Sequence, residues 1–279
     1  MINTGRLLIT KYLEENVLNN YKTAFLSWKV AKNFFFISNS PPLSQSPHFP
    51  SSSSLIAYYH FCEFQVLPKA VYPFNNITVA NDVSPYKGVG FAAGTEFSPG
   101  IHGEEQGSIE VQGRADSYIE LRKDAGNLNI KRSITILLYV YPLGRAGPIV
   151  NYKKDGHGVQ IYEDRFSDRV LATRVNRRNL RRTAVIKKTG ILTRNEWHYV
   201  GMTYDYSSGL VSLWHNDQEV SSGNIGRTEI ATQFDVRIGA RQTSTDDFFK
   251  GRVACLQFYS TVLTQRQIEK ARIACKPCK

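Results

Sequence analysis

The feature that most constrains this chain is a long series of short β-type segments, which begins near Lys69 and continues almost to the C-terminus. Within these segments Val, Ile, Leu, Tyr, Phe and Trp recur at alternate positions, a pattern typical of half-buried strands. Turn signals such as Leu143-Gly144 and Ser208-Gly209 separate them. The predicted strands are 108–111, 118–121, 134–141, 148–152, 159–162, 170–175, 184–187, 197–204, 210–214, 236–239 and 251–258. About eleven short strands predict an all-β fold of two packed antiparallel sheets, a sandwich or jelly roll.

One short helix is predicted after the last strand. Thr264 can cap its N-terminus, and Gln267 stands three residues later, which is the spacing of a capping box. Ile268 and Ala271 then share one face with residue 274 or 275. We expect this helix to cover a sheet edge or to seal one end of the sandwich.

Composition divides the chain into three parts. Residues 1–40 have loose helical spacing without a capping signal, and we interpret them as an uncertain, partly helical extension; a helix that docks on a partner is the alternative. Residues 41–68 include the segment PPLSQSPHFPSSSS and are predicted to be a flexible Ser/Pro-rich linker. Residues 69–279 are predicted to form the β domain.

Positive charge is concentrated in one stretch. The net charge of +11 predicts attraction to anionic partners, and residues 169–188, RVLATRVNRRNLRRTAVIKK, contain no acidic residue. The candidate polyanion-binding residues are Arg174, Arg177, Arg178, Arg181, Arg182, Lys187 and Lys188. Two strands joined by a turn near Asn179 would place four of these arginines around its tip, where their planar guanidinium groups match sulfate, phosphate or carboxylate. The alternative is a solvated edge strand whose charge prevents aggregation.

Several motifs resemble one known family. The segment 248–275 reads FFKGRVACLQFYSTVLTQRQIEKARIAC, and NEWHYVGMTYDYSSGLVSLWHNDQEV and SITILLYVYPLGRAGPIVNY precede it. Together with AVYPFNNITVANDVSPYKGVG, these motifs resemble the laminin-G-like, pentraxin-like domains of the concanavalin A-like lectin superfamily, over about residues 69–275. The resemblance implies a two-sheet jelly roll. Two departures are Pro85 after the Ser84 turn and the absence of glycine at the tip 216–218.

The resemblance also implies a disulfide between Cys255 and Cys275, which would pin the terminal helix to the last strand. The bridge would close a loop of about 20 residues, for which chain entropy gives roughly 3 kcal/mol; a buried free thiol at Cys255 is the alternative. Pairing of Cys62 with Cys278 stays open. A disulfide favours an extracellular, secreted location, as does the glycosylation sequon at Asn76, although no signal peptide is visible. The sequence contains no apolar run long enough for a transmembrane helix.

The sequence contains few residues suited to catalysis or to metal binding. The acidic pairs 104–105, 163–164 and 246–247 are adjacent, so on strands their side chains would point to opposite faces and could not act on one bond. We therefore expect no catalytic residue and no enzymatic activity. Calcium is the one candidate cofactor. The family often binds it at one rim, and Asp82, beside Asn81, is the candidate ligand; Asp205 and Asp246 lie in other loops. The alternative is that Asp82 and Asp205 are turn residues.

The sequence thus predicts a non-catalytic extracellular recognition or adhesion module. Rim loops and the basic hairpin would bind glycans, sulfated or acidic matrix polymers, or extracellular proteins. A carbohydrate-active enzyme on the same fold and a purely structural or oligomerising module are the alternatives. Nucleic acid is not expected, because the chain offers neither a reading helix nor stacking aromatic residues set among basic ones.

Overall fold

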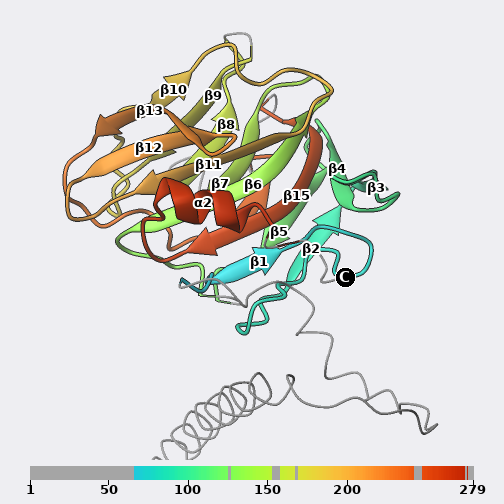
Figure 1. Cartoon of the computed structure of the whole chain (residues 1–279), viewed down its shortest axis with the longest axis horizontal. Coiled ribbons are helices and arrows are strands. Elements are labelled where there is room, and N and C mark those ends of the chain that lie inside the picture. The colour runs from blue at the N-terminus through green and yellow to red at the C-terminus, as the bar shows by residue number, and fades with distance from the viewer. Residues whose placement is uncertain are drawn as a thin grey trace, which may run out of the picture. The chain divides into compact units, whose positions relative to one another are not determined.

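Two antiparallel β-sheets packed face to face form the domain, as the alternating sequence predicts (Figure 1). The structure is a computed structural model that describes residues 66–124, 127–152, 158–166, 169–241, 247–273 and 275. The predictions for residues 1–40, for most of the 41–68 linker, and for Cys62, Cys278 and Asp246 lie outside the described residues.

The first sheet carries the terminal helix on its outer face, and we call it the helix-side sheet. Its strands in spatial order are β13 (Gln218–Asn224), β12 (Leu210–His215), β11 (His198–Tyr204), β6 (Ile134–Pro142), β15 (Lys250–Tyr259), β4 (Ser108–Gln112) and β3 (Glu96–Ser98), with β1 (Ala70–Tyr72) also paired to β15. The second, or opposite, sheet has the order β10 (Ile186–Lys188), β9 (Leu171–Val175), β8 (Val159–Glu163), β7 (Pro148–Tyr152), β14 (Val236–Ile238), β5 (Tyr118–Leu121) and β2 (Gly90–Ala93).

All eleven predicted strands are present, with ends that differ from the prediction by no more than two residues. The described residues contain four further strands, β1, β2, β3 and β13. Three of them are only three or four residues long, and β13 is an edge strand of mostly polar, partly exposed residues. None of the four therefore has the alternating apolar pattern on which the prediction depended.

Strand alternation builds the core between the two sheets. On β6, the side chains of Ile134, Ile136, Leu138 and Val140 belong to this core, whereas Tyr139 belongs to a second apolar cluster on the outer face. Burial of each large apolar side chain stabilises the fold by about 1.5–3 kcal/mol. The second cluster therefore lies outside the sandwich core, on the side of the helix-side sheet that carries the terminal helix.

Helix α2 (Gln265–Ala271) covers part of this outer cluster with Ile268 and Ala271, which are fully buried. Its capping box is confirmed: the Gln267 backbone amide donates to Thr264 Oγ1 at 3.4 Å, and the Thr264 amide donates to Gln267 Oε1 at 2.8 Å. The Cys255–Cys275 disulfide is also present and joins the end of the helical segment to β15. In the part of the chain that the structure describes, no helix has the length and apolar character that crossing a membrane requires.

Candidate functional site

The predicted basic hairpin lies at one edge of the opposite sheet. Strands β9 and β10 pair antiparallel, with Thr173 opposite Ile186 and Ala172 opposite Lys187. The connection 176–185 is longer than a tight turn, although the Leu180 amide donates to the Arg177 carbonyl at 2.7 Å and closes a turn within it. The predicted hairpin is therefore present. Because its connection is long, its basic side chains need not lie on the same face.

Two of the predicted arginines hold this connection to the sandwich. Arg177 Nη2 donates to the Ile225 carbonyl at 3.4 Å. Arg178 Nη1 donates to Asn129 Oδ1 at 3.1 Å, and its Nε lies 3.9 Å from a Glu229 carboxylate oxygen. These side chains are half-buried and serve the fold, so they do not form one charged tip with Arg181 and Arg182.

Three other predicted cations, Arg174, Arg182 and Lys187, line one hollow of about 360 Å³ on the outer face of the opposite sheet. We call it the basic hollow. The strand register explains part of this convergence, since Gln160 pairs with Arg174 across β8 and β9. Arg181 and Lys188 are exposed and do not line the hollow.

The acidic groups in the basic hollow are already paired with bases. Asp247 lies 3.0 Å from Arg241, Asp164 lies 3.7 Å from Lys187, and Glu163 lies 2.7 Å from Arg194. In contrast, Arg174 and Arg182 form no ion pair within the described part of the chain. The buried Nε of Arg174 also has no hydrogen-bond partner among these residues.

Tyr162 and Gln160 contribute neutral groups to the hollow. Burial raises the pKa of the Tyr162 hydroxyl, and the neighbouring Arg174 charge partly offsets this effect. The phenol therefore stays a neutral hydrogen-bonding group beside a guanidinium. Together these residues could bind a carboxylate or sulfate.

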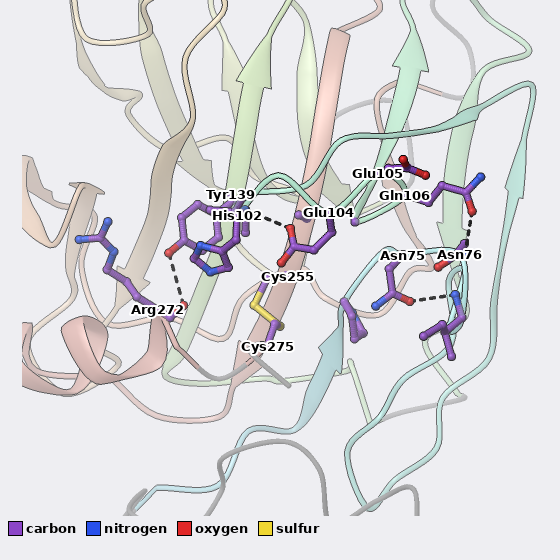
Figure 2. Close-up of a pocket in the computed structure, with 15 residues that line it drawn as sticks. Asn75, Asn76, His102, Glu104, Glu105, Gln106, Tyr139, Cys255, Arg272 and Cys275 are labelled. Carbon is purple, nitrogen blue, oxygen red and sulfur yellow. Dashed lines mark hydrogen bonds between the residues drawn. A yellow bond between two sulfur atoms is a disulfide. The ribbon is translucent and has the colours of Figure 1, made fainter. Parts of the chain in front are cut away.

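A second concave region lies on the helix-side sheet, between the loop 99–107 and the end of α2. Figure 2 shows Arg272 at one end, Asn75 and Asn76 at the other, and the Cys255–Cys275 disulfide between them. This hollow of about 470 Å³ is continuous with a neighbouring one of about 420 Å³, since both are lined by Ile101, His102, Tyr139 and Arg272. We call the combined region the aromatic groove.

The floor of the aromatic groove follows from strand register. Tyr139 on β6 faces Tyr199 on β11 and Ala254 on β15. The small Ala254 side chain leaves room beside Tyr139, and the bulge after Ala254 places Cys255 at a positive φ of 50°. The loop wall is also ordered, because Glu104 accepts a hydrogen bond from the His102 amide at 3.0 Å (Figure 2).

Sequence reasoning missed this groove, although a signal was present. Tyr139, Tyr141, Trp197 and Tyr199 all stand at positions that alternate with core residues on two predicted strands. Aromatic residues on the outward face of two neighbouring strands indicate that this face is covered by another element or binds a ligand. The pattern could have drawn attention to this face before the structure was known.

The calcium candidate Asp82 accepts hydrogen bonds from its own loop and from strand β1. Its two carboxylate oxygens accept hydrogen bonds from the amides of Val71, Ser84 and Gly88 and from the Ser84 hydroxyl, at 2.7–3.2 Å. No group of three or more His, Cys, Asp or Glu side chains suited to a metal occurs among the described residues. Calcium binding at Asp82 stays a prediction.

Two further predictions concern surface loops. Asp205 accepts hydrogen bonds from the Ser208 hydroxyl and from the amide and hydroxyl of Ser207, which lower its pKa, as expected for a turn residue. Asn76 is exposed, and its side-chain amide donates to Gln106 Oε1 at 2.7 Å (Figure 2). Glycosylation of Asn76 stays a prediction.

Comparison with known proteins agrees with the fold. A family model described as the concanavalin A-like lectin/glucanases superfamily matches residues 112–269. None of the curated proteins matches the sequence.

Several solved structures with a similar fold are binding domains, most of them from botulinum neurotoxins. The botulinum neurotoxin serotype G binding domain has a TM-score of 0.58 at 13% identity, and the match covers 73% of the present chain and 50% of the neurotoxin chain. The binding domain of Paraclostridial Mosquitocidal Protein 1 has a TM-score of 0.58 at 16% identity and covers 73% and 51%. The botulinum neurotoxin serotype D domain, solved with N-acetylneuraminic acid, has a TM-score of 0.58 at 12% identity and covers 73% and 50%. The chain thus spans about half the length of these structures, and at such low identity the likeness shows a shared fold alone.

Proposed function

Because the chain belongs to the concanavalin A-like lectin/glucanases superfamily, we propose that it is a non-catalytic module that binds acidic glycans in the basic hollow. The observation that carries this proposal is the pair Arg174 and Arg182, which line the hollow without an ion pair among the described residues, while each acidic group there has a basic partner. The positive charges of these two arginines are therefore left for an anionic ligand to neutralise.

The chemistry of the ligand follows from these groups. A guanidinium binds a carboxylate or sulfate through two parallel hydrogen bonds, and Tyr162 and Gln160 can bind neighbouring hydroxyl groups. Sialic acids and sulfated sugars both combine an anion with hydroxyl groups. The serotype D domain was solved with N-acetylneuraminic acid, and cell entry of botulinum neurotoxin type C, another neighbour, depends on interaction with two ganglioside molecules. These ligands support the chemical class only, because this chain matches half of each neighbour.

Binding of this kind is weak for each contact and sensitive to salt. A partly exposed charge pair contributes about 0.2–1 kcal/mol, so useful affinity needs several contacts together. Exposed charges are screened over about 8 Å at physiological ionic strength. We therefore propose repeated or multivalent acidic glycans, on cell surfaces or in matrix, as the physiological ligands.

We also propose that the module has no catalytic activity and that it acts outside the cell. Glycosidases of the common type need two carboxyl groups on either side of one bond, whereas Glu163, Asp164 and Asp247 each lie within an ion pair. The Cys255–Cys275 disulfide supports an oxidising compartment. Adhesion through cell-surface or matrix glycans is the function that combines these features.

Matched pairs of glycans test the proposal on the full chain. We expect sialyllactose to bind at least about tenfold more tightly than lactose, a difference of about 1.4 kcal/mol, and sulfated heparin fragments to bind more tightly than desulfated ones. The preference should weaken as salt increases. Equal affinity for sialyllactose and lactose, together with equal affinity for sulfated and desulfated heparin fragments, would refute the proposal.

A further inference from the structure

The outer face of the helix-side sheet carries an aromatic cluster that helix α2 covers only in part. The Tyr139 and Tyr199 ring centroids are 4.7 Å apart, and the Trp197 ring meets Tyr139 at 6.4 Å and Tyr141 at 5.3 Å in edge-to-face contacts. Helix α2 buries Tyr199 and Tyr139, but Trp197 stays partly exposed. The helix therefore leaves one end of the cluster open to solvent.

Apolar groups continue along the open part of the groove. Ile273 is 44% exposed and Ile101 is half-buried, and both line the same hollow as Trp197. Two edge-to-face contacts hold the indole in place, so a ligand that covers it need not order it first. An ordered, partly exposed tryptophan between aliphatic side chains is a suitable surface for a flat apolar face.

Polar groups of both kinds surround this surface. Arg272 lies over the Tyr199 ring at 5.7 Å and pairs with Asp217 at 2.6 Å, so its guanidinium is fixed at one end. Along the other wall, Figure 2 places His102, Glu104 and Gln106 around the hollow. A ligand with hydroxyl groups around its edge would find donors at Arg272 and acceptors at Glu104.

From these features we propose that the aromatic groove is a second binding site, which accepts a neutral pyranose of an oligosaccharide stacked on Trp197. The C–H face of a pyranose is apolar and weakly positive, whereas an aromatic face is apolar and negative, so the two attract in water. The equatorial hydroxyl groups point outward toward the polar walls. Volumes of about 470 and 420 Å³ lie within the roughly 300–1,000 Å³ typical of small-ligand pockets.

A peptide is the rival class of ligand, and the geometry disfavours it. Peptides are commonly recognised by addition to a free sheet edge, but β6 and β11, which form the floor, each have paired strands on both sides. Their backbone groups are used within the sheet. The groove therefore offers side chains alone, which suits a ring with peripheral hydroxyl groups.

The test uses the full chain with a panel of neutral oligosaccharides: cellotriose, maltotriose, mannotriose and chitotriose. Dissociation constants are measured for the wild type, for Trp197→Ala, and for Phe91→Ala as a control. Phe91 is a partly exposed aromatic residue on the opposite sheet, where it contacts Tyr118. We expect at least one saccharide to bind, with a loss of about tenfold or more in Trp197→Ala, the effect of an aromatic hot spot, and no change in Phe91→Ala.

A second measurement does not depend on the stability of the variant. In the wild type, the indole N–H resonance of Trp197, identified by its loss in Trp197→Phe, should shift on titration. The Trp214 resonance should not, because that indole is 8% exposed and donates to Thr203. The inference is overturned if no saccharide shifts the Trp197 resonance, or if both alanine variants lose affinity equally.

This inference is independent of the basic hollow, and the two proposals can fail separately. Substitution of Arg182 and Lys187 should leave neutral saccharide binding unchanged, and Trp197→Ala should preserve the preference for sialyllactose over lactose.

Discussion

The Cys255–Cys275 disulfide gives the most quantitative prediction about the stability of the domain. The bridge joins residues 20 apart in sequence. Loop-closure entropy for a loop of this length corresponds to about 3 kcal/mol. We therefore expect reduction of the bridge, or the variant Cys255→Ala/Cys275→Ala, to lower the free energy of unfolding by about 3 kcal/mol. For a domain of this size, each kcal/mol changes Tm by about 2–4 °C, so Tm should fall by about 6–12 °C.

The loss of stability should be greatest at helix α2. The bridge fixes the segment that follows α2 to β15, where Ile268 and Ala271 cover the outer aromatic cluster. Urea unfolding of the oxidised and reduced protein measures the total change, and hydrogen exchange measures the protection of residues 265–271 relative to the central strands. We expect the helix amides to lose protection first. A change in stability below about 1 kcal/mol, when chain entropy predicts about 3, or helix protection that is unaffected by reduction, would contradict this reasoning.

Three further predictions concern other parts of the domain. Glu120→Gln should lower the free energy of unfolding, measured in urea, by about 3–5 kcal/mol. The reason is that Arg237, which pairs with Glu120 at 2.6 Å and is 8% exposed, keeps its buried charge when the carboxylate is removed. A loss below about 1 kcal/mol, the contribution of an exposed ion pair, would contradict this prediction. Burial, and to a lesser extent the neighbouring His198, lowers the pKa of His215 from 6.5 to about 4. The unfolded chain therefore binds a proton more readily than the folded one, and the free energy of unfolding should fall as pH drops from 6.5 through 4. His215→Gln should flatten this pH dependence, and an unchanged slope would refute the assignment. Secreted protein should carry an N-linked glycan at Asn76, seen as a mass loss on enzymatic deglycosylation that is absent in Asn76→Gln; a wild-type mass without glycan would show that the sequon is unused.

Strand positions could be predicted because they depend on local alternation. The run 134–141 is recognisable since each second residue must be apolar to reach the core, and the structure places β6 at Ile134–Pro142. The same holds for the capping box of α2, which needs only Thr264 and Gln267. Strand β13 (Gln218–Asn224) escaped prediction because its residues face solvent, and hydrogen bonds to β12, rather than side-chain burial, define it.

The candidate sites could be predicted only in part, because they depend on contacts between distant residues. The sequence identifies all the cations of the basic hairpin, but not that Arg178 reaches Asn129, 49 residues away, while Arg174 faces the hollow. Likewise, Tyr139 and Trp197 become neighbours only through the pairing of β6 with β11. Local pattern supplies the chemistry of these residues, and long-range register decides which of them act together.

The most direct test of the basic hollow is the dissociation constant of sialyllactose for two charge-matched variants. Arg182→Ser/Lys187→Ser removes two cations that line the hollow, and Arg181→Ser/Lys188→Ser removes two exposed cations from the same segment that do not. If the hollow binds the acidic group, the first variant should lose about tenfold in affinity, or 1.4 kcal/mol, and the second should stay close to the wild type. Equal losses in both variants, or no loss in either, would contradict binding of acidic glycans in the basic hollow.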